Sequence, residues 1–235
     1  MEHTKAFNIA IDGPAGAGKS TIARLTAGKL GFVYVDTGAM YRAIALYMLR
    51  NGVPATDKEA VAGAVRDVTI TIRYEEGSQR VLLNGEDVSG LIRTEEVGNT
   101  ASLVSAVPAV REHLLKLQRE LAGSTDVIMD GRDIGTCILP NADVKIFLSA
   151  SSAVRAKRRY KELTEKGETC NLEKIEQDII KRDEQDANRP IAPLKRAEDA
   201  VLIDSSEMTI AEVVGAIFAE AEKKGLKLPE GALEK

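Results

Sequence analysis

The chain has 235 residues, a mass of 25.3 kDa and a formal net charge of −4 at pH 7. Hydrophobic residues make up 44% of it and charged residues 29%, a balance typical of a soluble globular protein and unlike a disordered or fibrous chain. Aromatic residues are only 4% and tryptophan is absent, which disfavours nucleic-acid binding by stacking, and the net negative charge disfavours polyanionic partners. We therefore expect neither a nucleic-acid nor a membrane partner.

Cysteine and histidine are too sparse for a zinc cluster. The two cysteines, Cys137 and Cys170, lack Cys-x-x-Cys spacing, and only His3 and His113 could supply imidazole ligands. We interpret His113, which lies in a helical run, as structural or solvent-facing. The first residues lack the apolar run of a secretion signal, no stretch reaches the length of a membrane span, and two free thiols suit a reducing compartment, so we expect a cytoplasmic protein.

Short apolar, β-branched runs alternate with helical patterns along the chain. This alternation predicts an α/β fold in which helices cover both faces of a five-stranded parallel sheet. In such sheets ligands bind beyond the carboxyl ends of the strands, so the residues after each run are the first candidates for a site. The predicted strands are 7–12, 32–36, 126–130, 144–148 and 200–204.

A segment of different character separates the second and third predicted strands. Two strand-like runs, 68–74 and 80–83, flank the polar turn 75–79 and predict an antiparallel β-hairpin. We interpret residues 56–107 as an inserted subdomain, with an edge hairpin of the main sheet as the alternative. The core would then comprise residues 1–55 and 108–225, followed by a C-terminal tail of frayed helix and linker at 226–235.

Directly after the first predicted strand stands a phosphate-binding loop. Residues 13–21 read Gly-Pro-Ala-Gly-Ala-Gly-Lys-Ser-Thr, which satisfies G-x-x-x-x-G-K-[ST] between a strand and a helix. The glycines let successive N–H groups point at phosphate oxygens, and the helix N-terminus adds the positive end of its dipole. Lys19 would bridge the outer phosphates of ATP, and Ser20 or Thr21 would ligate Mg²⁺, with Ser20 preferred. The expected ATP-binding residues are Gly13, Pro14, Ala15, Gly16, Ala17, Gly18, Lys19, Ser20 and Thr21.

The phosphate-binding loop alone does not distinguish a motor, a switch and a kinase. Asp130 ends the apolar run 127–129 as a Walker-B aspartate would, but Gly131 follows in place of the glutamate common in motor ATPases. The chain also has no Asn-Lys-x-Asp sequence, with which signalling GTPases read guanine. Both features favour a kinase.

Arginines gather after the predicted strand ends and in a late helical run. Thr37 can cap the helix that carries Arg42, and Arg182 and Asp186 lie four residues apart on one helix face. Phosphoryl transfer to a second phosphate brings two polyanions together, so fixed cations are its main requirement. Arginine suits this role because its planar fork binds phosphate bidentately and stays charged. The sequence therefore favours an acceptor that carries an ionised phosphate.

Four separated motifs together resemble the bacterial cytidylate (CMP) kinases: the phosphate-binding loop, Asp-Thr-Gly-Ala-Met-Tyr-Arg at 36–42, Asp-Gly-Arg-Asp-Ile-Gly-Thr at 130–136, and Arg182-Asp183 through Asn188-Arg189. The resemblance spans about residues 9–221 and includes Asn84–Ser89 and Ile92-Arg93 of the insert. It implies the reaction ATP + (d)CMP ⇌ ADP + (d)CDP with Mg²⁺, by direct in-line transfer. It also implies a fold of core, monophosphate-binding insert and short helical lid, here near 155–170.

The resemblance assigns roles residue by residue. Arg42, Arg132 and Arg189 would hold the CMP phosphate and the transferring group, and Arg182 and Asp186 would bind the sugar hydroxyls. Ser102, Arg111 and Asp133 would recognise cytosine, whose N4 amine suits a carboxylate that the O4 carbonyl of uracil would oppose. The catalytic set is Lys19, Arg132 and Arg189, and the CMP-binding set is Thr37, Tyr41, Arg42, Ser102, Arg111, Asp130, Arg132, Asp133, Arg182, Asp186 and Arg189.

Other interpretations remain open at this point. A kinase for another nucleoside monophosphate or small metabolite is the runner-up, followed by a nucleotide-dependent regulatory switch and, more distantly, a nucleic-acid-binding module. Arg155, Arg158 and Arg159 are equal candidates for a lid contact with ATP, and we expect a monomer.

Overall fold

The computed structural model describes residues 6–75 and 77–232, so that His3 lies outside the described residues. Its centre is a five-stranded sheet in which every pairing is parallel. The strand order is β2-β6-β1-β7-β8, and the predicted strands are confirmed to within one residue at each end. The strands are β1 (Asn8–Asp12), β2 (Val33–Asp36), β6 (Val127–Gly131), β7 (Val144–Ser149) and β8 (Val201–Asp204).

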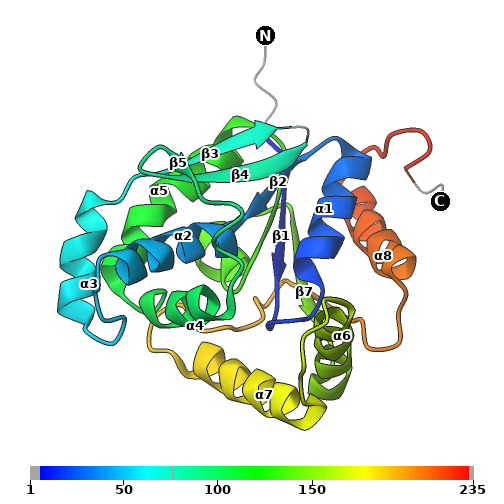
Figure 1. Cartoon of the computed structure of the whole chain (residues 1–235). Coiled ribbons are helices and arrows are strands. Elements are labelled where there is room, and N and C mark those ends of the chain that lie inside the picture. Colours follow the sequence, from blue (N-terminus) through cyan, green and yellow to red (C-terminus); the bar gives the residue numbers. More distant parts are fainter. Residues whose placement is uncertain (1–5, 76, 233–235) are drawn as a thin grey trace.

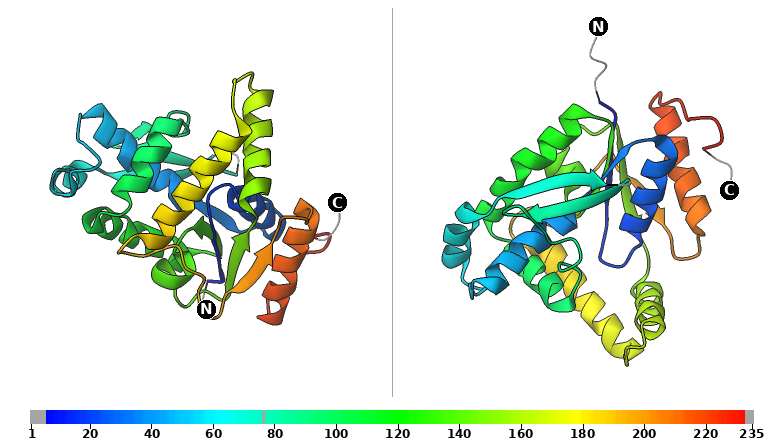
Figure 2. Two further views of the ribbon diagram at one scale, coloured as in Figure 1. Left: turned by 90° about the horizontal axis from the view of Figure 1, so that it is seen from below. Right: turned by 45° about the horizontal axis from the view of Figure 1, so that its top comes forward.

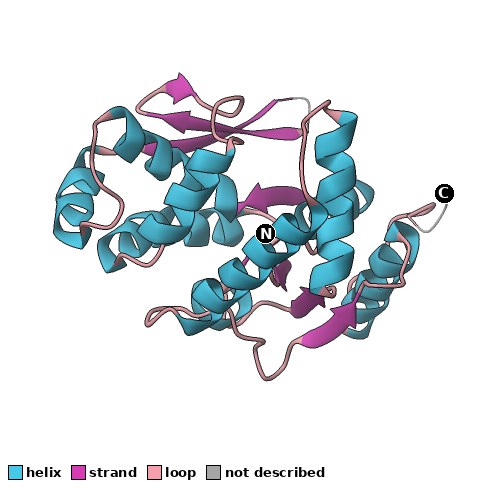
Figure 3. Cartoon of the chain, turned by 60° about the horizontal axis from the view of Figure 1, so that its bottom comes forward, coloured by secondary structure: helices cyan, strands magenta, loops and turns pink. Residues whose placement is uncertain are grey.

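Helices cover both faces of this sheet, as the alternating pattern predicts (Figures 1 and 3). Successive residues of β1 point to opposite faces, so Ile9 packs in one hydrophobic cluster and Ala10 in the other. Helices α1 (Lys19–Leu30) and α8 (Ile210–Lys223) pack on the face of Ile9. Helices α2 (Thr37–Arg50) and α5 (Pro108–Ser124) pack on the face of Ala10. The molecule therefore has the three-layer α/β fold expected from the sequence.

The insert forms a second, antiparallel sheet of order β3-β4-β5, so the hairpin is not an edge of the main sheet. Strand β4 begins two residues earlier than predicted, at Ser78, and the two-residue strand β5 was missed because so short a pattern carries no periodicity. Val61, Ile70 and Val97 of the insert share one hydrophobic cluster with α2. Its elements are α3 (Lys58–Ala64), the 3₁₀ turn η1 (Val65–Asp67), β3 (Ile70–Glu75), β4 (Ser78–Leu83), β5 (Glu86–Asp87) and α4 (Glu95–Val104).

Two charged helices, α6 (Ser152–Glu165) and α7 (Leu172–Asn188), form a helical hairpin that projects from the core where the lid was expected (Figure 2). The chain reverses direction near Gly167, whose φ of +78° is readily adopted by glycine. Asp186, near the C-terminal end of α7, is buried. The end of α7 contacts the segment after β6, where Arg132 Nε pairs with Asp186.

The described part of the C-terminal tail is packed against the core, so its interpretation as frayed linker is wrong. Leu226 and Leu228 contact the cluster of α1 and α8, and Ala232 is buried within it. The Ala232 carbonyl accepts a hydrogen bond from Lys29 Nζ at 3.0 Å. Alternating leucines at 226 and 228 were the sequence signal for this packing.

Among the described residues, no helix combines the length and the apolar character that crossing a bilayer requires. The same residues contain no group of three or more histidine, cysteine or acidic side chains that could hold a metal ion by themselves. The sequence-based expectation that the chain has no zinc cluster was argued from two of these residue types, cysteine and histidine.

Candidate active site

The phosphate-binding loop joins β1 to α1. Gly13 is packed so closely that an added Cβ would lie 2.0 Å from the Leu148 carbonyl oxygen, which explains why a residue with a side chain does not fit there. In the described part of the chain, no side chain caps the first turn of α1, and no acidic residue lies in that turn. The first N–H groups of α1 are thus available to an anion, as in other phosphate sites at helix N-termini.

Lys19 lies within this loop and is buried, with Nζ donating to the Pro14 carbonyl oxygen at 2.7 Å. Burial, together with the positive charge of Arg132, lowers the pKa of Lys19. A bound polyphosphate would favour the charged ammonium and offset this cost. Lys19 therefore has the position and the electrostatic setting of a phosphate ligand.

Asp130 connects the phosphate-binding loop to the start of α2. Its Oδ2 accepts a hydrogen bond from Ser20 Oγ at 3.0 Å, and its Oδ1 accepts from the Tyr34 hydroxyl at 2.9 Å. The Asp130 backbone oxygen accepts from Thr37 Oγ1 at 2.8 Å. Burial raises the pKa of this carboxyl. The Asp130 side chain, which was predicted among the CMP-binding residues, therefore lies on the donor side.

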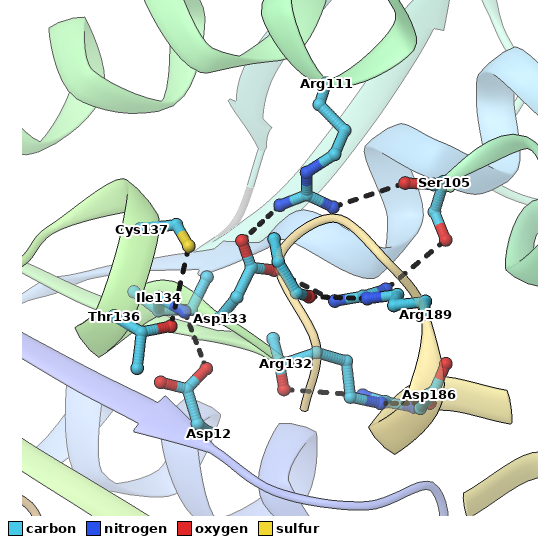
Figure 4. A network of polar contacts seen from close by, with 12 residues as sticks. Asp12, Ser105, Arg111, Arg132, Asp133, Ile134, Thr136, Cys137, Asp186 and Arg189 are labelled. Carbon is cyan, nitrogen blue, oxygen red and sulfur yellow. Dashed lines mark hydrogen bonds and ion pairs between the residues drawn. The ribbon is translucent and has the colours of Figure 1, made fainter. Parts of the chain in front are cut away.

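The segment after β6, which includes the π-helix η2 (Ile134–Ile138), is held by a carboxylate that the sequence interpretation did not assign to the site. Asp12 ends β1, and its two oxygens accept from the backbone N–H groups of Ile134 and Gly135, each at 2.7 Å (Figure 4). Burial raises the pKa of Asp12 to about 6, although these two hydrogen bonds oppose the shift. Gly13, the first residue of the phosphate-binding loop, directly follows Asp12. Asp12 therefore connects this loop to the segment that carries Arg132 and Asp133.

Asp133 is the centre of a buried polar cluster (Figure 4). It forms ion pairs with Arg111 and, at 3.3 Å, with Arg189. Arg111 Nη1 donates to the Ser105 carbonyl oxygen at 3.3 Å, and Arg189 Nη1 contacts Ser105 Oγ at 3.5 Å. Burial raises the pKa of Asp133, while the two arginines oppose that shift. The cluster therefore presents one carboxylate acceptor beside two guanidinium donors.

Ser105 was missed by sequence reasoning, which favoured Ser102 three residues earlier. Ser102 is half-buried on α4, and its carbonyl oxygen accepts from Ser105 Oγ at 2.9 Å. Tyr41 lies at the other side of Arg111, with the ring centroid 5.7 Å from Cζ. Burial raises the pKa of Tyr41 to about 12, so the Tyr41 hydroxyl is uncharged at neutral pH where the ring borders the cluster.

Four arginines converge beside this cluster, from α2, the insert, the β6 loop and α7. Arg42 Nη1 donates to the carbonyl oxygens of Ile92 and Thr94, at 3.1 and 3.3 Å. Burial lowers the pKa of Arg42 to about 10, and the positive charges of Arg182, Arg93 and Arg132 lower it further than the one opposing carboxylate raises it. This mutual repulsion describes a cluster of positive charge that a bound anion would stabilise. The four are Arg42, Arg93, Arg132 and Arg182.

The clearest evidence that this arginine cluster suits an anion comes from Arg182. Its Nε is buried and has no hydrogen-bond partner within residues 6–75 and 77–232, and burial and Arg132 lower its pKa. Arg132 Nε pairs with Asp186 at 2.9 Å, which ties the β6 loop to α7. Arg93 belongs to a segment that carries the family resemblance, but it was not assigned a role among the predicted site residues.

The three lid arginines prove to be unequal. Arg155 is buried, and Nη1 donates to the Ala15 carbonyl oxygen of the phosphate-binding loop at 3.0 Å. It also forms an ion pair with Asp183 of α7, at 2.5 Å. Arg158 instead binds the Ser205 carbonyl oxygen at 2.7 Å, and Arg159 forms a surface pair with Glu162 at 2.8 Å. Of the three, Arg155 is therefore the one that contacts the donor loop.

Residues 9–223 match the family model described as cytidylate kinase. The chain belongs to the cytidylate kinase family. It is 51% identical over 218 residues to the cytidylate kinase of Lactobacillus johnsonii, covering 93% of this chain and 95% of that one. It is 52% identical over 218 residues to that of Lactobacillus gasseri, with the same two coverages. The resemblance to bacterial cytidylate kinases is confirmed.

A solved structure of an uncharacterized protein from Eubacterium ventriosum aligns with a TM-score of 0.51 at 11% identity, over 92% of this chain and 98% of that one. This likeness concerns the fold alone. The chemistry of two side chains beside the phosphate-binding loop fits a Mg²⁺ ion. Ser20 Oγ and the Asp130 carboxylate are adjacent hard oxygen donors of the kind Mg²⁺ prefers, whereas Thr21 is exposed.

Proposed function

We propose that this chain transfers the γ-phosphoryl group of ATP to the 5′-phosphate of CMP or dCMP, yielding ADP and CDP or dCDP. The observation that carries the proposal is the Asp133 cluster next to the converging arginines, one of which, Arg132, is close enough to Lys19 of the phosphate-binding loop that its charge adds to burial in lowering the pKa of Lys19. Membership in the cytidylate kinase family supports the same assignment.

On the donor side, the loop N–H groups and Lys19 bind the ATP phosphates. Ser20 and Asp130 would hold Mg²⁺, which when bound would neutralise part of the phosphate charge. Lys19 exchanges its contact with the Pro14 carbonyl for the outer phosphates. Arg155 fixes the loop from the lid side through the Ala15 carbonyl.

On the acceptor side, Arg42, Arg132 and Arg182 surround the monophosphate, and Arg189 joins them at the transferring group. A phosphate monoester is already ionised at neutral pH, so its oxygen attacks in line without a general base. Arg132 and Arg189 stabilise the charge that spreads over the equatorial oxygens in the transition state. In this proposal Asp186 orients Arg132 and binds the sugar with Arg182.

The base is selected at Asp133. Its carboxylate accepts from the N4 amine of cytosine, while Arg111 donates to the ring acceptors N3 and O2. Uracil presents a carbonyl at the same place, and two facing acceptors leave a buried group unpaired. Closure of the lid and insert excludes water, which would otherwise compete as the phosphoryl acceptor.

An acceptor panel tests the proposal. We expect ADP release in a coupled assay with CMP and dCMP to exceed that with UMP or AMP by about 10²-fold or more in kcat/KM, as hydrogen-bond mismatches discriminate strongly. Equal rates with all four nucleotides would instead support a less selective kinase. Nucleotide binding without acceptor-dependent turnover would support the regulatory switch.

We also propose that the chain acts in the cytoplasm as a monomer. Its substrates are intracellular nucleotides, and both cysteines are free thiols. Sedimentation equilibrium with and without CMP tests the monomer, for which a mass of 25.3 kDa is expected.

A further inference from the structure

Strand β2 is the edge strand of the main sheet, next to β6. The Val33 N–H binds the Asp126 carbonyl oxygen at 3.0 Å, so the backbone of Val33 faces the sheet interior. Because backbone directions alternate along a strand, Tyr34 and Asp36 direct their N–H and C=O groups to the free edge. Such groups need partners, since an open edge invites pairing with other chains.

The hairpin of the insert supplies those partners through side chains. The Tyr74 hydroxyl donates to the Tyr34 carbonyl oxygen at 3.1 Å. Gln79 Oε1 accepts from the Asp36 N–H at 2.8 Å, and Gln79 Nε2 donates to the Asp36 carbonyl oxygen at 3.2 Å. A side-chain amide has the same donor and acceptor as a peptide unit, so Gln79 pairs with β2 as another strand would. We call Tyr74 and Gln79 the β2 clasp.

The clasp holds the residue from which the acceptor site projects. Asp36 caps α2 by accepting from the Ala39 N–H at 2.9 Å, and its carboxylate pairs with Arg93 at 2.7 Å. The next residue, Thr37, binds the Asp130 carbonyl oxygen, and α2 carries Arg42 one turn later. A shift of the Asp36 backbone would therefore move Arg93, which pairs with the Asp36 carboxylate, and Arg42, which lies on α2.

We propose that Gln79, supported by Tyr74, is a positioning residue for acceptor binding. Gln79 contacts no reacting atom; it acts by fixing the first turn of α2 against the core. The inference rests on the proposed function, because it assigns the arginines of α2 and the adjoining loop to the acceptor phosphate. A merely structural role of Gln79 would alter stability without separating the two substrates.

Steady-state kinetics of Gln79→Ala separate the two roles. We expect KM for CMP to rise about fivefold, as loss of positioning hydrogen bonds implies, while KM for ATP and kcat stay within about twofold. Gln79→Glu keeps the acceptor for the Asp36 N–H but loses the donor and adds negative charge beside Asp36, so its KM for CMP should rise at least as far. The control is Thr71→Ala, an exposed position on the same hairpin. An unchanged KM for CMP, or equal increases for both substrates, would overturn the proposal.

Hydrogen exchange provides a readout that does not depend on which acceptor is used. Without ligand, amides in the first turn of α2 should exchange about fivefold faster in Gln79→Ala than in the unsubstituted chain or in Thr71→Ala, since local opening becomes easier. Unchanged exchange there would overturn the clasp even if CMP proved to be the acceptor. If the first turn of α2 exchanged faster in Gln79→Ala but the unsubstituted chain did not phosphorylate CMP, the clasp would stand and the proposed function would be rejected.

Discussion

Asp133 is buried between Arg111 and Arg189, and each of its oxygens accepts from one of them. The two arginines compensate for the burial of the carboxylate, and the carboxylate compensates for them. Removing one member of such a buried cluster lowers the free energy of unfolding by more than the net contribution of that member, because the remaining charges are left unpaired. At the scale of single residues, then, Asp133, which we propose reads the base, also holds Arg189 in place.

Asp133→Asn tests this double role. The amide presents an N–H₂ group to the cytosine amine and to the arginines, so we expect kcat/KM for CMP to fall by about 10²-fold or more. The ratio of CMP to UMP turnover should fall as well, because the amide N–H₂ group can donate to the uracil carbonyl, which the carboxylate could only face as a second acceptor. Initial rates with both acceptors measure this, and Asp67→Asn, an exposed substitution in the insert, is the control. An unchanged ratio would remove Asp133 from base recognition.

Gln79, Ser105 and Arg93 show where prediction from sequence stops at this scale. The phosphate-binding loop was predictable because one continuous segment forms it and its spacing is dictated by phosphate geometry. Ser105 joins Arg189 across 84 positions of sequence, and Gln79 joins Asp36 across 43. Such partners are chosen by tertiary packing, which leaves no local pattern in the chain. Arg42 and Arg132 were predictable because they follow strand ends, where a parallel sheet places its ligands.

The elements around the site are connected through carboxylates and arginines at their ends. Asp12 of β1 binds the β6 loop, Asp130 of β6 binds α1 and β2, and Arg155 of α6 binds both the donor loop and α7. The strands themselves were predictable from their apolar runs. Strand β5 was not, because two residues are too few to show a period, and the two leucines of the tail, Leu226 and Leu228, were too short a pattern to outweigh its polar residues.

Arg155→Lys tests the connection between the donor loop and the lid helices. Lysine keeps the charge but has one nitrogen where arginine contacts Ala15, Ala150 and Asp183. We expect the free energy of unfolding to fall by about 2–3 kcal/mol and KM for ATP to rise. Urea unfolding and steady-state kinetics measure the two effects.

The matched control is Arg159→Lys, because the Arg159 pair with Glu162 lies at the surface. Exposed pairs contribute little, so a change of less than about 0.5 kcal/mol is expected. If the two substitutions had equal effects, Arg155 would be an ordinary surface arginine.

At the scale of the whole molecule, an acidic chain brings several arginines together at one site, close to carboxylates that are buried at or just after the strand ends. Asp12, Asp130 and Asp133 are all buried, and burial raises the pKa of each. The net charge of −4 averages over this pattern. Charge composition therefore predicted which large partners to exclude but not where the small anions bind.

The raised pKa of Asp12 makes the stability of the molecule depend on pH. The pKa is about 6 in the folded chain, against 3.8 for an exposed aspartate carboxyl, so the folded state binds more protons between these values. This contribution is present below pH 4 and is lost as pH rises through 6. Between pH 5 and pH 7.5, Asp12 should lower the free energy of unfolding by about 1.4 kcal/mol.

Asp12→Asn isolates this contribution because asparagine does not titrate. The free energy of unfolding of the unsubstituted chain, minus that of the variant, should decrease by about that amount from pH 5 to pH 7.5 in urea titrations. A difference that is constant with pH would show that Asp12 is ionised throughout the range.

The parallel pairing of β1 also has a consequence for the order in which the protein is made. Asn8 pairs with Val127 and Ile9 with Val144, so both neighbours of β1 belong to the second half of the chain. At about 5–20 residues per second, roughly 6–24 s pass between synthesis of β1 and of β6. During that time the strand that carries the phosphate-binding loop has neither of its sheet partners. A ribosome-bound chain ending before β6 should therefore bind no ATP, and the nascent apolar strand is the segment that a chaperone would shield.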